Sequence, residues 1–370
     1  MIEALAVAAG LAVLVVGGEL VVRGASRLAI SLGISPVVIG LTVVAFGTSS
    51  PELAVSLGSS LQGSPDVAVG NVVGSNVYNI LLVLGVAALI RPLVVQQKLV
   101  WFDVPLVIGA SVLFWVLALD GSLEIMEGSL LLILLGVYTV VSIAAGRRDS
   151  AEITAEYRAG ISPGREDAPV PSRGRDVFVF LVGLGALVIG AQVLVWGATA
   201  IARSVGIPEL VVGLTVVAIG TSLPELVTSV VAAVRGQRDL AVGNAVGSNL
   251  FNILGVLGVS AIVVPGGVPI AAGAVSFDIP VMTVVAVACL PLFFTGHLIR
   301  RWEGALFLAF GAAYTAYLVL DATQHPFRDG LADAMVWFVL PLTGLTLVLV
   351  VAAEVGRRRT RDPATPARRA

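Results

Sequence analysis

Two stretches of sequence decide the fold: residues 40–53 read GLTVVAFGTSSPEL, and residues 213–226 read GLTVVAIGTSLPEL. The likeness continues downstream, because SPDVAVGNVVGSNVYNILLVLG at 64–85 matches QRDLAVGNAVGSNLFNILGVLG at 237–258. The match has no gap over 46 positions, of which 29 are identical, at a constant offset of 173. The chain therefore contains a long internal repeat.

The repeat lies in a very apolar chain. Of the 370 residues, 57% are hydrophobic and only 12% are charged, whereas charged residues make up about 25% of a typical soluble domain. A net charge of -2 and a single cysteine, Cys289, exclude a basic nucleic-acid binder and a disulfide-stapled secreted domain. With 41 glycines and a mean hydropathy of +1.00, the composition predicts an all-α integral membrane protein surrounded by lipid.

Eleven apolar runs have about the 20 residues that a helix needs to cross a bilayer. They lie near residues 3–22, 36–59, 67–90, 100–119, 125–145, 177–200, 209–233, 240–263, 276–295, 303–320 and 334–354. Lys and Arg favour cytoplasmic loops. With the N-terminus outside, 20 of the 22 Lys and Arg residues fall on the cytoplasmic side. We therefore expect a multi-pass protein of the cell membrane whose linker and C-terminus lie in the cytoplasm.

The repeat divides the chain into two halves of five spans each. Residues 1–145 form the first five-helix repeat, 146–176 a polar cytoplasmic linker, and 177–320 the second repeat. Residues 321–370 add one more transmembrane helix and an Arg-rich tail. Because five is odd, the second repeat enters the membrane from the opposite side, which gives an inverted repeat. Inverted repeats can present a midplane site to each side in turn, so this architecture favours transport.

Each repeat places one carboxylate deep in its second span, at Glu52 and at Glu225. A carboxylate at this depth costs about 2.5–3.5 kcal/mol, so an intramembrane acid is a candidate functional residue. Pro51 and Pro224 directly precede the two acids. Proline cannot donate to the helix ladder and clashes with the carbonyl four residues back, so each span should be broken beside its carboxylate.

Further oxygen donors recur at helical spacing around the two acids. Thr48 lies four residues before Glu52, and on the next span Ser75 lies four residues before Asn79. The second half repeats the pattern with Thr221, Ser248 and Asn252. Carboxylate, amide, hydroxyl and backbone oxygens are ligands for hard cations such as Ca²⁺ and Na⁺. Serines and threonines alone would indicate hydrogen bonds between helices, but the duplicated glutamate favours a cation site.

Other small or charged residues have structural interpretations. Glycines four apart on the third and eighth spans would let these helices approach another backbone closely: Gly70 and Gly74, then Gly243 and Gly247. Aspartates near the ends of spans are expected to be helix caps or helix starts rather than ion ligands: Asp66 and Asp239, then Asp103 and Asp278.

The motif pairs GTSSPEL with GSNVYN, and GTSLPEL with GSNLFN, resemble the two alpha-repeats of the sodium/calcium exchangers in the calcium/cation antiporter superfamily. The repeat that carries the resemblance covers ten of the eleven predicted spans. The resemblance implies a ten-helix inverted-repeat core with cation sites between the second, third, seventh and eighth helices. It implies exchange of Ca²⁺ for Na⁺ by alternating access, with these ions as cargo and with no cofactor.

The resemblance also implies a set of ligands. The calcium ligands are the carboxylates of Glu52 and Glu225 and the backbone carbonyls of Thr48 and Thr221. The sodium ligands add Ala45, Ser49, Ser75, Ala218, Ser222 and Ser248, with Asn79 and Asn252 at the centre. Well-known sodium/calcium exchangers have Asp where this chain has Asn252. The site here therefore carries two carboxylates and two amides, which leaves the driving ion open.

Three other functions are compatible with parts of the pattern. Exchange of Ca²⁺ for H⁺ fits the same residues if the two glutamates carry protons. A passive cation channel fits less well, because paired broken helices in inverted repeats suit alternating access better than an open pore. An intramembrane enzyme is disfavoured, because the chain has no HExxH motif and only two histidines, both in predicted loops.

Overall fold

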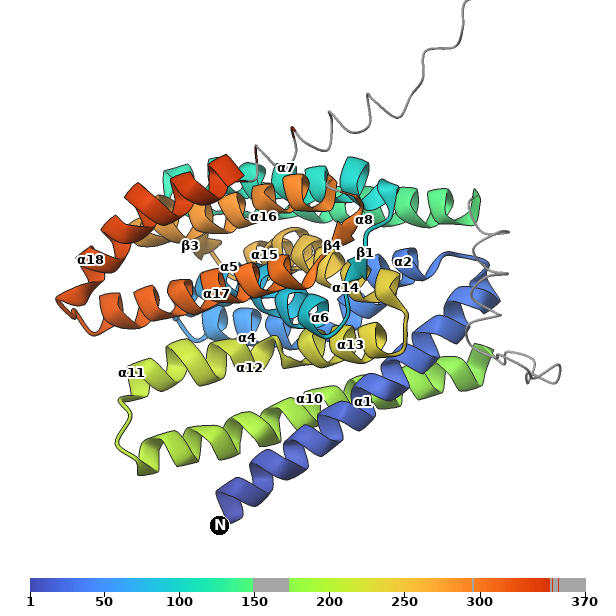
Figure 1. The fold of residues 1–370 in the computed structure, drawn as a ribbon, viewed down its shortest axis with the longest axis horizontal. Helices are drawn as coiled ribbons and strands as arrows, with labels where there is room; N and C mark the ends of the chain where they lie inside the picture. Colours follow the sequence, from blue (N-terminus) through green and yellow to red (C-terminus); the bar gives the residue numbers. More distant parts are fainter. Residues whose placement is uncertain (149–172, 295, 347, 349–351, 353–370) are drawn as a thin grey trace, which may run out of the picture.

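The computed structural model describes residues 1–148, 173–294, 296–346, 348 and 352, and these are almost entirely helical (Figure 1). Eight of the described helices are long and apolar enough to cross a membrane, and two pairs of shorter helices, each bent at a break, bring the number to ten. These ten correspond to the first ten predicted spans. The expectation of an all-helical membrane fold is confirmed.

The first half runs from a long helix through a broken one to three more crossing segments. In chain order it consists of α1 (Ile2–Leu32), α2 (Pro36–Ile39), η1 (Gly40–Val44), α3 (Ala45–Thr48), α4 (Ser50–Leu61), α5 (Pro65–Tyr78), η2 (Asn79–Leu84), α6 (Gly85–Ile90), β1 (Leu93–Val94), η3 (Leu99–Asp103), α7 (Val104–Leu117), η4 (Ala118–Asp120), β2 (Ser122–Leu123) and α8 (Ile125–Arg148). Of these, η4 is a 3₁₀ turn, and η1, η2 and η3 are π-helical turns.

The second half repeats this order. It consists of α10 (Arg173–Ser204), α11 (Glu209–Val212), η5 (Gly213–Val217), α12 (Ala218–Thr221), α13 (Leu223–Val234), α14 (Arg238–Leu250), η6 (Phe251–Val256), α15 (Leu257–Val263), β3 (Val268–Pro269), η7 (Ala274–Asp278), α16 (Ile279–Phe294), β4 (Leu298–Ile299) and α17 (Arg301–Ala322). The π-helical turns η5, η6 and η7 fall where η1, η2 and η3 fall in the first half. Such turns are frequent at functional sites.

The extra C-terminal segment begins with α18 (Phe327–Ala334) and the π-helical turn η8 (Met335–Val339). The predicted eleventh span, 334–354, is described only in part, because residues 347, 349–351 and 353–370 lie outside the described residues. The eleventh crossing therefore stays a prediction.

Two details at helix ends differ from the expectations. α1 continues ten residues beyond the predicted span 3–22 and ends at Gly33, which adopts a left-handed conformation and donates its N–H back to the last turn. Within the helix, Glu19 pairs with Arg23 and also with Arg235 of the other half, the latter at 2.6 Å. The prediction that Asp66 and Asp239 cap helices is wrong. Each lies at the second position of its helix, where a negative charge still interacts favourably with the helix dipole.

The two halves are interlocked. β1 pairs antiparallel with β4, and β2 pairs antiparallel with β3, so each two-stranded ribbon joins a loop of one half to a loop of the other. α1 packs along α10, and the two long helices cross at one edge of the molecule (Figure 1). Their contact is lined with glycine: a Cβ on Gly17 would meet the Leu187 nitrogen at 2.8 Å. Close backbone approach of this kind requires small residues.

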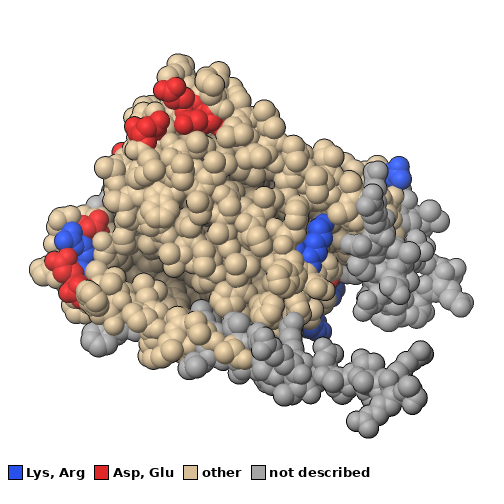
Figure 2. Space-filling model, turned by 90° about the horizontal axis from the view of Figure 1, so that it is seen from above, with Lys and Arg blue, Asp and Glu red and all other residues tan. Residues whose placement is uncertain are grey.

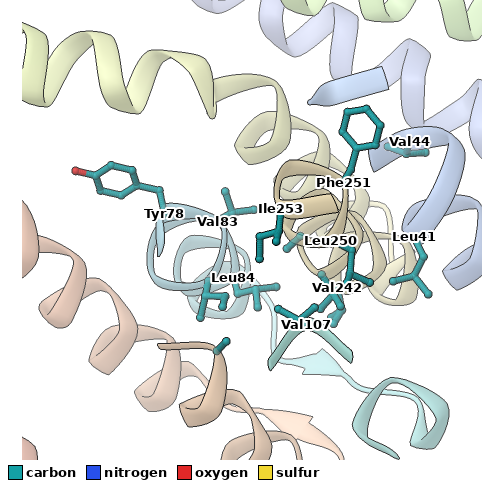
Figure 3. Close-up of a cluster of buried hydrophobic side chains, with 14 of the residues drawn as sticks. Leu41, Val44, Tyr78, Val83, Leu84, Val107, Val242, Leu250, Phe251 and Ile253 are labelled. Carbon is teal, nitrogen blue, oxygen red and sulfur yellow. The ribbon is translucent and has the colours of Figure 1, made fainter. Parts of the chain in front are cut away.

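The centre of the molecule is formed by the third and eighth spans. Of the most apolar stretch of each span, 72% is buried in Pro65–Ile90 and 83% in Arg238–Val263, against 39% or less in the other unbroken spans. Figure 3 shows Val83 and Leu84 of η2 facing Leu250 and Ile253 of α14 and η6. The candidate ligands on these two spans therefore lie deep inside the helical bundle.

Charged residues gather at opposite ends of the molecule. In Figure 2, Asp and Glu lie mainly at the upper and left edges, whereas Lys and Arg, apart from one group at the left, lie at the right. The surface between the two ends carries almost no charge in this view. An apolar band between charged ends is the surface expected of a protein that crosses a bilayer.

Candidate cation-binding site

The second span of each half is broken beside its glutamate. The helix axis turns by 41° between the segments Pro36–Thr48 and Ser50–Leu61, and by 56° between Thr215–Thr221 and Leu223–Val234. Each half has a serine at the break, a proline at the second helical position and a glutamate at the third: Ser49, Pro51 and Glu52, and then Ser222, Pro224 and Glu225. Because proline lacks an N–H, the chain restarts as a new helix at this point.

Both glutamates are completely buried, with 0% of their surface exposed. Glu225 Oε1 accepts hydrogen bonds from Ser49 Oγ at 3.0 Å and from Ser248 Oγ at 3.5 Å. Glu52 Oε1 accepts one from Ser75 Oγ at 3.5 Å. The Oε2 atom of each glutamate has no hydrogen-bond partner. Buried carboxylates normally have hydrogen-bond partners or bind metal ions, so these two oxygens are candidate cation ligands.

Two asparagines that the sequence interpretation did not single out hold the first turns of the glutamate helices. Asn71 Nδ2 donates to the Glu52 backbone carbonyl at 3.2 Å, and Asn244 Nδ2 donates to the Glu225 carbonyl at 3.3 Å. Both asparagines lie in the AVGN segment that is identical in the two repeats. That identity was the available signal, and the structure assigns these amides a positioning role.

The central amides differ between the halves. Asn79 and Asn252 are both fully buried. Asn79 Nδ2 donates to Asn249 Oδ1 at 3.0 Å, and Asn249 Nδ2 donates to the Asn76 carbonyl at 3.2 Å, so the amide bridge between the repeats runs through Asn249. Neither amide atom of Asn252 has a partner. The Oδ1 atoms of both Asn79 and Asn252 therefore have no hydrogen-bond partner, and the two residues differ in that only the Asn79 Nδ2 group is bonded.

The remaining predicted ligands lie on the same four spans but are unequally buried. Thr48 Oγ1 donates to Asn244 Oδ1 at 3.2 Å and lies 3.4 Å from Ser248 Oγ. Thr221, its counterpart, donates only to the Ala218 carbonyl of its own helix, at 3.1 Å. Positions 45 and 48 are 1% exposed, whereas 218 and 221 are half-buried. The structure thus gathers the first-half ligands more tightly than those of α12.

The chemistry of the site is that of oxygen ligands. In the described part of the chain, no cluster of three His, Cys, Asp or Glu side chains could hold a metal ion. A cation between the two glutamates would therefore complete its shell with hydroxyl, amide and backbone oxygens. Such a set suits Ca²⁺ or Na⁺, and the two carboxylates would offset the charge of one divalent ion.

Asp103, which was predicted to start a helix, lies at the end of the π-helical turn η3 and bonds to the next span. η3 begins at Leu99, four residues before Asp103, and Asp103 is fully buried. Tyr138 Oη donates to Asp103 Oδ1 at 3.1 Å. Asp103 therefore links the fourth span to the fifth.

The sequence and the structure were compared with known proteins. The family model described as "Sodium/calcium exchanger protein" matches residues 2–144 and 176–320. The chain belongs to the sodium/calcium exchanger protein family. Its members are transporters, so this chain is a multi-pass membrane transporter of the cation antiporter class, and the resemblance drawn from the two motif pairs is confirmed.

Individual family members are similar over most of their length. The sodium/calcium exchanger MaX1 of Methanosarcina acetivorans is 34% identical over 340 residues, which cover 84% of this chain and 96% of MaX1. The inner membrane protein YrbG of Escherichia coli is 38% identical over 242 residues, covering 64% of this chain and 72% of YrbG. The solved structure of the sodium-calcium exchanger NCX_Mj, soaked with Na⁺ and Ca²⁺, matches with a TM-score of 0.72 and 31% identity, covering 85% of this chain and 98% of that one.

Proposed function

We propose that this family member exchanges Ca²⁺ for Na⁺ by alternating access at the site around Glu52 and Glu225. The observation that carries the proposal is the pair of fully buried carboxylates, each with one oxygen that has no hydrogen-bond partner. Two such charges in a region of low dielectric need a compensating cation. The names of MaX1 and NCX_Mj, both sodium/calcium exchangers, support the choice of ions.

Within this proposal, Ca²⁺ and Na⁺ use overlapping sets of ligands. Ca²⁺ is held by the carboxylates of Glu52 and Glu225 and by the carbonyls of Thr48 and Thr221. Na⁺ is held by the same four residues together with Ala45, Ser49, Ser75, Ala218, Ser222 and Ser248, and with the central amides of Asn79 and Asn252. The geometric support is the hydrogen-bond network that already joins Glu225 to Ser49 and Ser248.

The test is Ca²⁺ uptake by the purified protein in liposomes. The vesicles are loaded in turn with Na⁺, H⁺ or K⁺ at equal osmolarity and diluted into medium with Ca²⁺. The proposal predicts uptake that depends on an outward Na⁺ gradient and disappears when Na⁺ is equal on both sides. Uptake of Ca²⁺ without any counter-ion gradient would indicate a channel and contradict the proposal.

Exchange of Ca²⁺ for H⁺ is the second candidate, and the amides at Asn79 and Asn252 favour it. Two ionised glutamates give the site a charge of -2, so one Ca²⁺ or two Na⁺ neutralise it. A third Na⁺ would leave +1 in a region of low dielectric, which is costly. If a pH gradient alone drives uptake in the H⁺-loaded vesicles while a Na⁺ gradient does not, this second function replaces the first.

The proposal also includes the placement of the protein in the plasma membrane. The N-terminus lies outside, and the linker and the C-terminus lie in the cytoplasm, because this arrangement puts 20 of 22 Lys and Arg residues on the cytoplasmic side. A protein that fluoresces only in the cytoplasm, fused after Ala370, should be bright. A dark but fully expressed fusion, together with an active periplasmic reporter at the same position, would overturn both the orientation and the eleventh span.

A further inference from the structure

The two repeats have nearly the same sequence around their broken spans, but these spans are packed differently. α14 of the second half lies against the first part of the broken span of the first half, residues 36–48. A Cβ on Gly243 would meet the Val37 carbonyl oxygen at 2.8 Å, and a Cβ on Gly247 would meet the Leu41 Cα at 2.6 Å. The backbones of α14 and of the segment 36–48 are therefore in direct contact, and only glycine fits between them. We call this contact the closed seam.

In the other half α5 contacts α12, but its glycines make no equivalent close contact in this conformation. Gly70 and Gly74 of α5 correspond to Gly243 and Gly247, yet a Cβ on either would meet no atom within 4 Å. Gly213, the counterpart of Gly40, is equally open, whereas a Cβ on Gly40 would meet the Leu240 carbonyl oxygen at 3.0 Å. We call the region between α5 and the segment 209–221 the open seam.

Larger side chains show the same difference. In the closed seam the rings of Phe46 and Phe251 meet edge to face, with their centroids 5.1 Å apart. Their counterparts at the open seam, Ile219 and Tyr78, both line an apolar groove of about 840 Å³. The other walls of this groove come from α11 and η5, from η2, from α17 and from α18 of the C-terminal segment. The groove thus occupies the place that a packed contact fills in the other half.

We propose that Gly70 and Gly74 form the surface on which the segment 209–221 closes in a second conformation, in which Gly243 and Gly247 are released. The inference rests on the proposed alternating access and names the residues that make it possible. The two seams are built from matching sequence, so the contact that one makes is available to the other. Glycine inside a helix is destabilising relative to alanine, and the conformation described here gives Gly70 and Gly74 no contact that requires glycine.

Alanine substitutions at matched positions test this inference. Gly74→Ala, alone and with Gly70→Ala, should leave the thermal unfolding midpoint of the purified protein unchanged or raised, because each new methyl group meets no neighbour here. Ca²⁺ transport should fall about tenfold or more, because the closed form of the open seam is excluded. Gly247→Ala is the matched control and should lower the unfolding midpoint, since its methyl group would clash with the Leu41 backbone. Transport at the wild-type rate by the Gly70→Ala, Gly74→Ala double variant would overturn the inference.

Cross-linking provides a readout that does not depend on the cargo. In a Cys289→Ala background, one cysteine pair replaces Phe46 and Phe251, and a second pair replaces Ile219 and Tyr78. When the membranes are oxidised with copper phenanthroline, a direct disulfide should form in both pairs, each in a different conformation. Adding Gly74→Ala should suppress the disulfide at 219 and 78 and preserve the one at 46 and 251.

The outcomes separate this inference from the proposed function. If the 219 and 78 pair forms a disulfide that Gly74→Ala suppresses, while no gradient drives Ca²⁺ uptake, the seam exchange holds and the proposed cargo is wrong. If Ca²⁺ is exchanged for Na⁺ but that disulfide never forms, or forms equally in Gly74→Ala, the seam exchange is wrong and the proposed function holds.

Discussion

The closed seam and the open seam are the same stretch of sequence in two different arrangements. GLTVVA lies in the first part of the broken span in both halves. Gly40 of this stretch packs against α14, whereas its counterpart Gly213 makes no close contact. The break beside this stretch turns by 41° in the first case and by 56° in the second. Because local sequence is shared, the difference between the seams is one of conformation and not of sequence. Two packings that exchange equivalent contacts can differ little in free energy, which is what a switching element requires.

The hydrogen bonds at the site follow the same division. Ser49, beside the closed seam, donates to Glu225 across the repeat boundary at 3.0 Å. Ser222, its counterpart beside the open seam, is fully buried but has no partner for its hydroxyl group. The closed seam thus brings the hydroxyl of one repeat to the carboxylate of the other, and the open seam does not.

The largest expected effect is the loss of Ca²⁺ uptake when either buried glutamate is neutralised, and it should be similar in the two halves. Glu52→Gln and Glu225→Gln each keep the size of the side chain and remove its charge. With one glutamate neutralised, a bound Ca²⁺ would keep one uncompensated positive charge in the buried site. An uncompensated buried charge costs about 3–5 kcal/mol, so Ca²⁺ uptake should fall at least about 100-fold in either variant. Uptake into Na⁺-loaded liposomes measures this. Glu124→Gln, at an exposed position, is the control and should transport normally; near-normal uptake by Glu225→Gln would contradict the assignment.

The second effect should differ between the halves. Ser49→Ala removes a hydrogen bond to a buried carboxylate, and bonds to charged groups contribute about 1.5–3 kcal/mol. The free energy of unfolding should fall by that amount, measured in detergent without Ca²⁺. Ser222→Ala removes a hydroxyl that has no partner, so it should leave the stability nearly unchanged or raise it. Equal losses in the two variants would mean that the protein in solution does not hold one seam open and one closed.

The smallest effect concerns the central amides. Asn252 has no partner, so Asn252→Asp adds a carboxylate without breaking a hydrogen bond, whereas Asn79→Asp loses the bond to Asn249. Asn252→Asp should lower the Na⁺ concentration for half-maximal Ca²⁺ uptake roughly two- to tenfold, since the Coulomb gain is partly offset by desolvation. Asn79→Asp should instead lower the unfolding midpoint.

The readout for the amides is a Na⁺ titration with the liposome potential clamped by K⁺ and valinomycin. Moving one net charge through the full field couples to about 2.3 kcal/mol per 100 mV, so a change in stoichiometry alters the voltage dependence. Wild-type uptake that is steeply voltage-dependent, saturates at low Na⁺ and is unchanged by Asn252→Asp would show that the amides do not set the stoichiometry.

Much of the fold could be predicted from the sequence, because its signals are local. Apolar runs of sufficient length predicted eleven crossings, of which the first ten correspond to described helices or broken helix pairs, and the prolines before Glu52 and Glu225 predicted the two breaks. The ion pair between Glu19 and Arg235 was missed, because Arg235 lies in the other half of the chain. The bridge from Asn79 to Asn249 could not be predicted either, since helical spacing does not specify which of several nearby amides will meet across a repeat boundary.

The sequence could not predict which of the two seams is closed, because both have nearly the same sequence. Gly70, Gly74, Gly243 and Gly247 were expected to allow close contacts, and two of the four make them here. A repeated sequence is symmetric and carries no information about which copy is closed at a given moment. The sequence is compatible with the packed contact in either repeat, and the conformation determines which repeat forms it.

The two ribbons have a consequence for how the protein is made. β1 is synthesised some two hundred residues before its partner β4, and α1 leaves the ribosome long before α10, the helix against which its glycines pack. The first half must therefore wait in the membrane with its glycine-lined face uncovered until the second half has been inserted. The two repeats, although their sequences match, thus join into one assembly only after the second repeat has been synthesised.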